Sequence, residues 1–139
     1  MNQILGELGK SQKFKELLNQ IENKQSPIAI SGLNDVGAVQ IETAINQFGK
    51  KPICIITYKI VKICELYLHN MAKKIYENVK YFTENVVLFP KKEIVTYDYI
   101  AESKDLPYRR IETLNEIQSK RNLIVVTTIE AIMQKLPAK

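Results

Sequence analysis

The chain has few of the residues on which catalytic and metal sites depend. Its 139 residues include no tryptophan, one histidine (His69) and two cysteines (Cys54 and Cys64). A structural zinc site usually takes four cysteine or histidine ligands, so no metal site is expected. The single histidine has no nucleophile near it in the pattern, so no Ser-His-Asp or Cys-His arrangement can be assembled. The sequence therefore predicts no catalytic residue, and both cysteines are expected to be packed thiols.

Long hydrophobic runs and concentrated charge are also missing. No apolar stretch approaches the ~18 residues that a membrane-spanning helix needs, and the N-terminus lacks the basic and apolar regions of a secretion signal. We therefore expect a cytoplasmic protein with no membrane partner. The net charge of +5 favours nucleic acid or another acidic partner, but the lysines are spread along the chain and form no basic arm.

What is present is organised around a stretch near the N-terminus that has the order of a phosphate-binding fold. Residues 28–30 (Ile-Ala-Ile) are expected to form a strand, Gly32 and Gly37 bound a loop, and a helix follows. The glycine spacing is that of a phosphate loop, which next needs Lys for the phosphates and Ser or Thr for magnesium. Ala38 and Val39 stand at those two positions. We interpret the loop as a vestigial phosphate loop that binds no cofactor, although glycines serve many ordinary turns as well.

Short continuous apolar runs predict three more strands, at residues 52–57, 85–89 and 123–126. Such runs are typical of strands buried on both faces, as in a parallel sheet covered by helices. Helical spacing predicts helices between them, at residues 12–23, 58–83, 106–119 and from a capping box at 127–130 to Leu136. The alternation predicts an α/β fold with right-handed crossovers.

Several local expectations follow from the same pattern. Gly6 and Gly9 should loosen the chain before residues 12–23, whose apolar face would pack across the sheet or on a neighbouring domain. Gly49 should end the helix that follows the loop. The remaining expectations are a break at His69-Asn70, inward-facing Ile111, Leu114 and Ile117, and a surface carboxylate at Glu42.

Tyrosine and arginine residues gather in the least regular part of the sequence, at Tyr97, Tyr99, Tyr108, Arg109 and Arg110. Aromatic rings offer stacking faces for bases, and guanidinium groups neutralise phosphates. Tyr and Arg are also enriched where proteins contact one another. The cluster is therefore a candidate nucleic-acid or protein contact. In the alternative interpretation, the tyrosines pack on the sheet edge and the arginines pair with nearby carboxylates.

Three motifs carry a resemblance to a known family. Residues 88–99 read Leu-Phe-Pro-Lys-Lys-Glu-Ile-Val-Thr-Tyr-Asp-Tyr, residues 110–114 read Arg-Ile-Glu-Thr-Leu, and a strand at 124 leads to Gln-Lys-Leu-Pro at 134–137. In this order they resemble the N-terminal module of the bacterial transcription-repair coupling factor, Mfd. The resemblance runs from about Pro27 to the end of the chain and is strongest after Ala72. Residues 58–83 are longer than the corresponding helix of the family.

The resemblance implies a three-layer RecA-like (P-loop NTPase-like) domain with a mostly parallel sheet, similar to the first domain of the helicase UvrB. It divides the chain into an N-terminal helical extension (1–26) and a degenerate RecA-like domain (27–139), a fragment of a larger protein. Family members are ATP-dependent DNA translocases that remove stalled RNA polymerase and recruit UvrA. The connection between Tyr97 and Arg110 is too short for the hairpin with which UvrB threads DNA.

Three hypotheses for function follow. In the first, the chain is a non-catalytic module of a transcription-coupled DNA repair factor that docks to adjacent domains, to UvrA or to RNA polymerase. In the second, it is a nucleotide-binding P-loop ATPase fragment with an unusual loop. In the third, it is a small DNA-binding domain, which would bind DNA in a salt-dependent way through Arg109 and Arg110.

Overall fold

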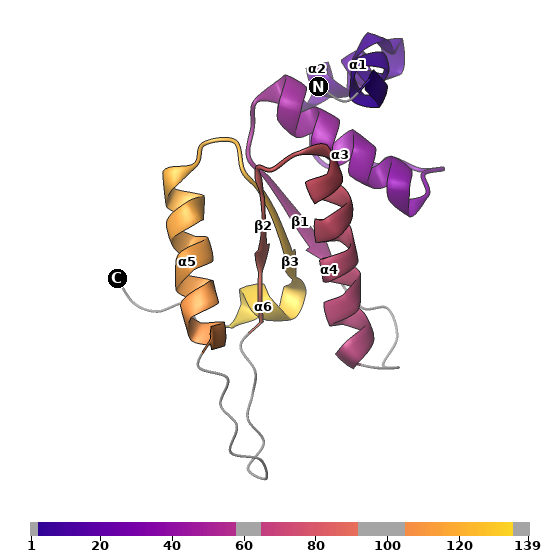
Figure 1. Ribbon diagram of the computed structural model, residues 1–139. Coiled ribbons are helices and arrows are strands. Elements are labelled where there is room, and N and C mark those ends of the chain that lie inside the picture. Colours follow the sequence, from indigo (N-terminus) through magenta and orange to yellow (C-terminus); the bar gives the residue numbers. More distant parts are fainter. Residues whose placement is uncertain (1–2, 58–64, 92–104, 135–139) are drawn as a thin grey trace.

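The computed structural model describes residues 3–57, 65–91 and 105–134, which form a small open sheet with helices on both faces (Figure 1). The sheet has three parallel strands in the order β1-β3-β2, so the last strand along the chain lies in the centre. The strands are β1 (Ile53–Thr57), β2 (Val86–Phe89) and β3 (Ile124–Thr128). The helices are α1 (Gln3–Lys10), α2 (Gln12–Glu22), α3 (Asp35–Gly49), α4 (Glu65–Phe82), α5 (Asp105–Ser119) and α6 (Ile129–Met133).

One face of the sheet carries the main core. Ile124 pairs in register with Ile53 on one side and with Val86 on the other, so the three side chains share this face. Helix α4 covers them with Ala72 and Val79, both buried. Because side chains alternate along a strand, Ile55, Val126 and Leu88 continue the same layer.

The opposite face is covered only in part. Val87 and Phe89 are buried on the α5 side, since α5 packs against β2. Beyond β3, the β1 residues at the same levels are Cys54, which is exposed, and Ile56, which is 46% exposed. The expectation that Cys54 is a packed thiol is therefore wrong, because α4 lies on the other face of the sheet, where Ile55 is buried, and Cys54 is exposed (Figure 1). Cys64 lies outside the described residues.

The N-terminal helices pack on α3 and not across the sheet. Leu5, Phe14 and Ala44 form a second cluster that contains no strand residue. The rings of Phe14 and Phe48 meet edge to face with their centres 5.9 Å apart. Gly9 does not loosen the chain as expected, because α1 runs through it and its lack of a side chain makes room for the Phe48 ring.

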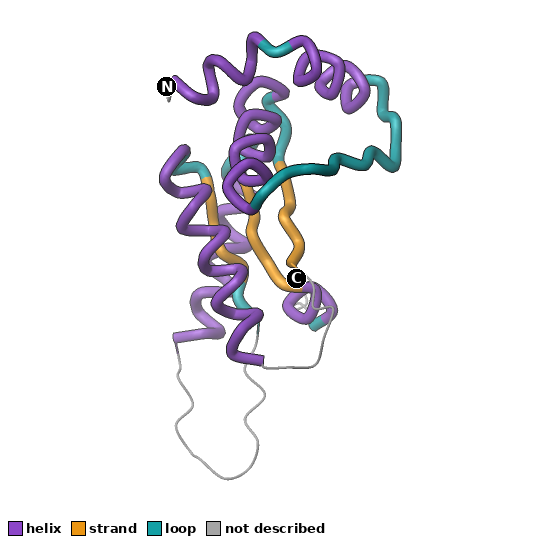
Figure 2. Tube along the Cα trace, turned by 90° about the vertical axis from the view of Figure 1, so that its right-hand side faces the viewer, coloured by secondary structure: helices purple, strands orange, loops and turns teal. Residues whose placement is uncertain are grey.

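The strand expected at residues 28–30 is absent, which corrects the predicted strand, loop and helix order. Figure 2 shows the whole connection between α2 and α3 as a loop. Ile28 and Ile30 face Leu8, Phe14 and Leu17 across an open groove, and Ile30 is 47% exposed. A run of three apolar residues does not by itself indicate whether the segment pairs in a sheet, and here it forms a loop.

Four smaller expectations are also corrected. Helix α4 continues through residues 69–70 without a break. Helix α3 includes Gly49, and Lys50 takes the left-handed conformation that ends it. Thr128, not Thr127, caps α6, which ends at Met133. Ile111 and Ile117, expected to face inward, are 48% and 37% exposed, whereas Arg110 and Thr113 of α5 are buried.

The predicted α/β class with a parallel sheet is confirmed for this small three-stranded sheet. The finer assignment to a RecA-like fold stays a prediction. Within the described part of the chain, no helix is both long enough and apolar enough to cross a membrane.

Candidate functional site

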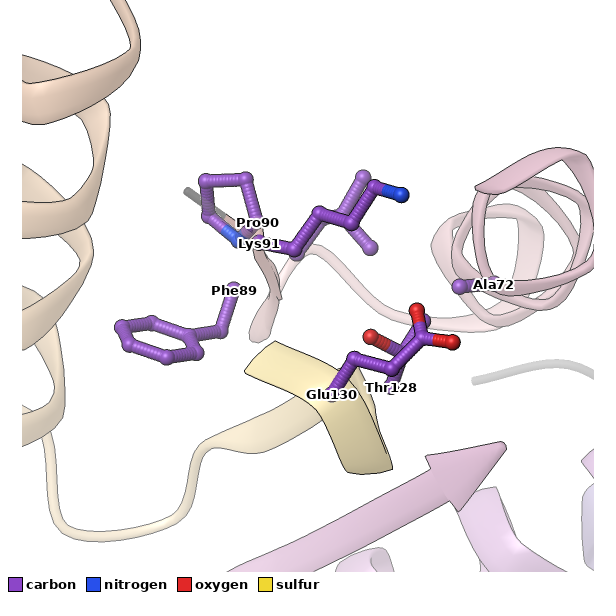
Figure 3. Close-up of a pocket in the computed structure, with 7 residues that line it drawn as sticks. Ala72, Phe89, Pro90, Lys91, Thr128 and Glu130 are labelled. Atoms are coloured by element: carbon purple, nitrogen blue, oxygen red, sulfur yellow. The ribbon is translucent and has the colours of Figure 1, made fainter. Parts of the chain in front are cut away.

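The carboxyl edge of the sheet is the place where open α/β folds bind ligands. In this chain the ends of β2 and β3 meet α4 and α6 there, around a hollow of about 10 Å³ (Figure 3). A single water molecule needs roughly that much space. The hollow is lined by Ala72, Leu88, Phe89, Pro90, Lys91, Thr128 and Glu130. This hollow is therefore too small for a nucleotide.

The strand ends are tied together by hydroxyl groups. The Thr127 hydroxyl lies 3.2 Å from the carbonyl oxygen of Phe89, to which it donates, and the Thr57 hydroxyl donates to the carbonyl oxygen of Thr127. The Thr128 hydroxyl accepts the Ala131 N–H and so caps α6. These hydroxyls satisfy backbone groups, a structural role that leaves them unsuited to act as nucleophiles.

Arg110 joins this edge from α5, and its side chain is only 6% exposed. Its Nη1 donates to the carbonyl oxygen of Pro90 at 2.5 Å and to Oε1 of Gln134 at 3.4 Å. The guanidinium lies over the Phe89 ring, 4.4 Å from its centre. Burial lowers the pKa of Arg110 from its ordinary value, and Nη2 is buried without a hydrogen-bond partner. Arg110 thus links α5 to the end of β2.

The other described residues of the predicted tyrosine and arginine cluster do not lie together with Arg110 on one buried surface. Tyr108 is 72% exposed and Arg109 is exposed, so both can contact a partner. They lie on other sides of α5 from the buried Arg110, because successive helical residues are about 100° apart. Tyr97 and Tyr99 lie outside the described residues.

The predicted vestigial loop begins α3. The Asn34 side chain accepts the Gly37 N–H at 2.7 Å, which occupies a donor that an anion would use. Asp35 adds a negative charge to the first turn and forms an ion pair with Lys74 at 3.7 Å. Val39 is buried in the main core, whereas Gly32 takes a positive φ of 80° in the preceding loop. That this turn descends from a phosphate loop stays a prediction.

Two ionisable groups stand out by their surroundings. Glu42, expected as a surface carboxylate, is half-buried on α3, and burial raises its pKa. Although Cys54 is exposed on its open side, partial desolvation by the rest of the protein also raises the pKa of its thiol, which makes it a poorer nucleophile at neutral pH. In residues 3–57, 65–91 and 105–134, no group of three His, Cys, Asp or Glu side chains could hold a metal ion. The raised pKa of Glu42 has no signal in the sequence, because it depends on helix packing.

Comparison with known proteins gives two curated relatives with the same name. The chain is 23% identical over 139 residues to the transcription-repair-coupling factor of Bacillus subtilis, a match that covers 99% of the chain and 11% of that relative. It is 31% identical over 71 residues to the transcription-repair-coupling factor of Rickettsia typhi, over 49% of the chain and 6% of the relative. The chain thus spans about a tenth of the first relative's length. No family model matches the chain, and no solved structure matches it significantly. The resemblance to the transcription-repair coupling factors is therefore confirmed across nearly the whole chain.

Proposed function

We propose that this chain acts as a non-catalytic module of a transcription-coupled DNA repair factor and works by docking to other proteins or domains. The observation that carries the proposal is the match to the Bacillus subtilis coupling factor over 99% of the chain. The resemblance implies adjacent domains, UvrA and RNA polymerase as docking partners.

The described residues support docking more than catalysis. The hollow at the carboxyl edge of the sheet has room for about one water molecule, and Ala38 and Val39 replace the residues that bind phosphates and magnesium. Large apolar side chains are exposed instead, on α6 and on strand β1. They are Ile56, Ile129, Ile132 and Met133. Exposed apolar groups of this size favour contact with another protein surface.

Equilibrium titration with fluorescently labelled ATP and magnesium tests the non-catalytic part of the proposal. We expect no saturable binding, because the loop supplies neither a lysine nor a hydroxyl for the phosphates. Micromolar affinity, or phosphate release by the purified chain, would support the P-loop ATPase alternative instead.

The docking part is tested by surface plasmon resonance with the immobilised chain and purified Bacillus subtilis UvrA and RNA polymerase. Saturable binding of either protein is expected. Binding of neither protein contradicts the proposal. A DNA duplex is the third analyte, and salt-dependent binding that Arg109→Ala weakens would support the DNA-binding alternative.

A further inference from the structure

A second and larger hollow lies between α3 and α4. Its volume is about 260 Å³, which is below the ~300–1,000 Å³ of sites for drug-sized molecules and suits one side chain. Its apolar walls come from both helices, at Ala38, Val39, Met71 and Ile75.

A carboxylate lines this apolar hollow. Glu42 is half-buried there beside Asn78, and its carboxylate has neither a hydrogen bond nor an ion pair among the described residues. A desolvated carboxylate without a partner costs free energy, and burial accordingly raises its pKa. A neutral apolar occupant would leave this cost in place, whereas a cation would remove it.

The one described cation that lines the hollow is already engaged. Lys74 forms an ion pair with Asp35 at the rim, where both side chains are largely exposed. Asp35 and Lys74 are the other charged groups that line the hollow with Glu42, and together the three carry a net charge of −1. The hollow therefore complements one added positive charge.

We propose that the hollow between α3 and α4 binds an arginine side chain of a partner polypeptide, with Glu42 accepting its guanidinium N–H groups. Arginine fits better than lysine, because its planar fork pairs with a carboxylate through two hydrogen bonds and is more weakly hydrated. Its aliphatic stem packs on the walls formed by Val39, Met71 and Ile75. The inference rests on the proposed docking function, for which it names the chemistry of the partner.

The test is an NMR titration of the isotope-labelled chain with the blocked peptide acetyl-Ala-Leu-Arg-Leu-Ala-amide. The matched peptide carries citrulline, which has the shape of arginine without its charge. We expect the arginine peptide to shift the amide resonances of Ala38 and Ile75 and to bind about tenfold more tightly than the citrulline peptide. Equal affinities, no measurable binding, or shifts confined to other surfaces would overturn the inference.

Two variants and one further measurement make the test specific. Glu42→Gln, which keeps the shape of the side chain, should lower the affinity for arginine to that for citrulline. Glu77→Gln, on the exposed side of α4, should leave it unchanged. In the wild-type chain, saturating arginine peptide should bring the pKa of Glu42 down towards its ordinary value, as followed by its carboxyl carbon resonance. An unmoved pKa contradicts the proposal.

The outcome for the hollow can be told apart from the outcome for the proposed function. If the arginine peptide fails while UvrA or RNA polymerase binds, docking uses another surface and only this inference falls. If the peptide binds while neither protein does, the arginine site stands and the proposed function falls.

Discussion

Arg110 ties three elements together through one buried cation. From α5 it reaches the carbonyl oxygen at the end of β2, the Phe89 ring and the Gln134 side chain after α6. The sequence suggested a surface contact here, since helical periodicity treats every arginine as polar. Its burial depends on the Phe89 ring and on the carbonyl oxygen of Pro90. Both groups lie about twenty residues earlier in the chain, so no local sequence pattern indicates these contacts.

We expect Arg110→Ala to lower the free energy of unfolding by about 2 kcal/mol, because it removes charge-assisted hydrogen bonds and the contact with Phe89. Urea denaturation followed by circular dichroism measures the change. Arg109→Ala on the exposed side of the same helix is the matched control and should stay within about 0.5 kcal/mol of wild type. Arg110→Met keeps the apolar stem, so its stability separates packing from hydrogen bonding. An Arg110→Ala variant as stable as Arg109→Ala would contradict this role.

The elements of the sheet could be predicted from sequence more fully than the elements around it. The strand predicted at residues 123–126 corresponds to β3 (Ile124–Thr128), because a strand buried on both faces has a continuous apolar run. Ile124 and Val126 are completely buried on one face, and Thr127 on the other face is 1% exposed. Residues 28–30 carry the same apolar signal but form a loop that borders an open groove, because strand pairing depends on tertiary contacts. In the same way, the hollow beside Glu42 depends on how α3 packs on α4, and the spacing of residues within either helix does not indicate that packing.

The packing of α1 on α3 depends on the absence of a side chain at Gly9. A methyl group at Gly9 would lie 2.6 Å from Cζ of Phe48, so the ring must move away and lose its contact with Phe14. We expect Gly9→Ala to destabilise the chain by about 1–3 kcal/mol, although alanine favours a helix. Thermal unfolding of Gly9→Ala, Phe48→Leu and the double variant measures the coupling. A destabilisation that Phe48→Leu does not relieve would place the cause elsewhere.

The molecule as a whole has two clusters of buried side chains of unequal strength. The larger joins α3, α4 and all three strands, while the smaller holds α1 and α2 on α3 through Leu5 and Phe14. Phe82 packs against both clusters. Most other residues of α1 and α2 are exposed or half-buried, so less apolar burial opposes the opening of these two helices.

Hydrogen exchange measured by mass spectrometry should reveal this difference. We expect peptides from α1 and α2 to exchange through local openings, and peptides from β3 to exchange only when the whole chain unfolds. Leu5→Ala should speed exchange in α1 and α2. In β3 it should change exchange only as much as it changes the global free energy of unfolding. Equal protection of α2 and β3 in the wild-type chain would show a single cooperative unit instead.

The central position of β3 also governs when the sheet can form during synthesis. Both outer strands pair only with this last strand, and the Thr57 hydroxyl bonds to a carbonyl group 70 positions later. At ~5–20 residues per second, a ribosome takes several seconds to make that stretch. During that interval, β1 and β2 leave the ribosome with their backbone groups unpaired, open to chaperones and to wrong partners. A nascent chain arrested before residue 124 consequently lacks the strand with which both outer strands pair in the described sheet.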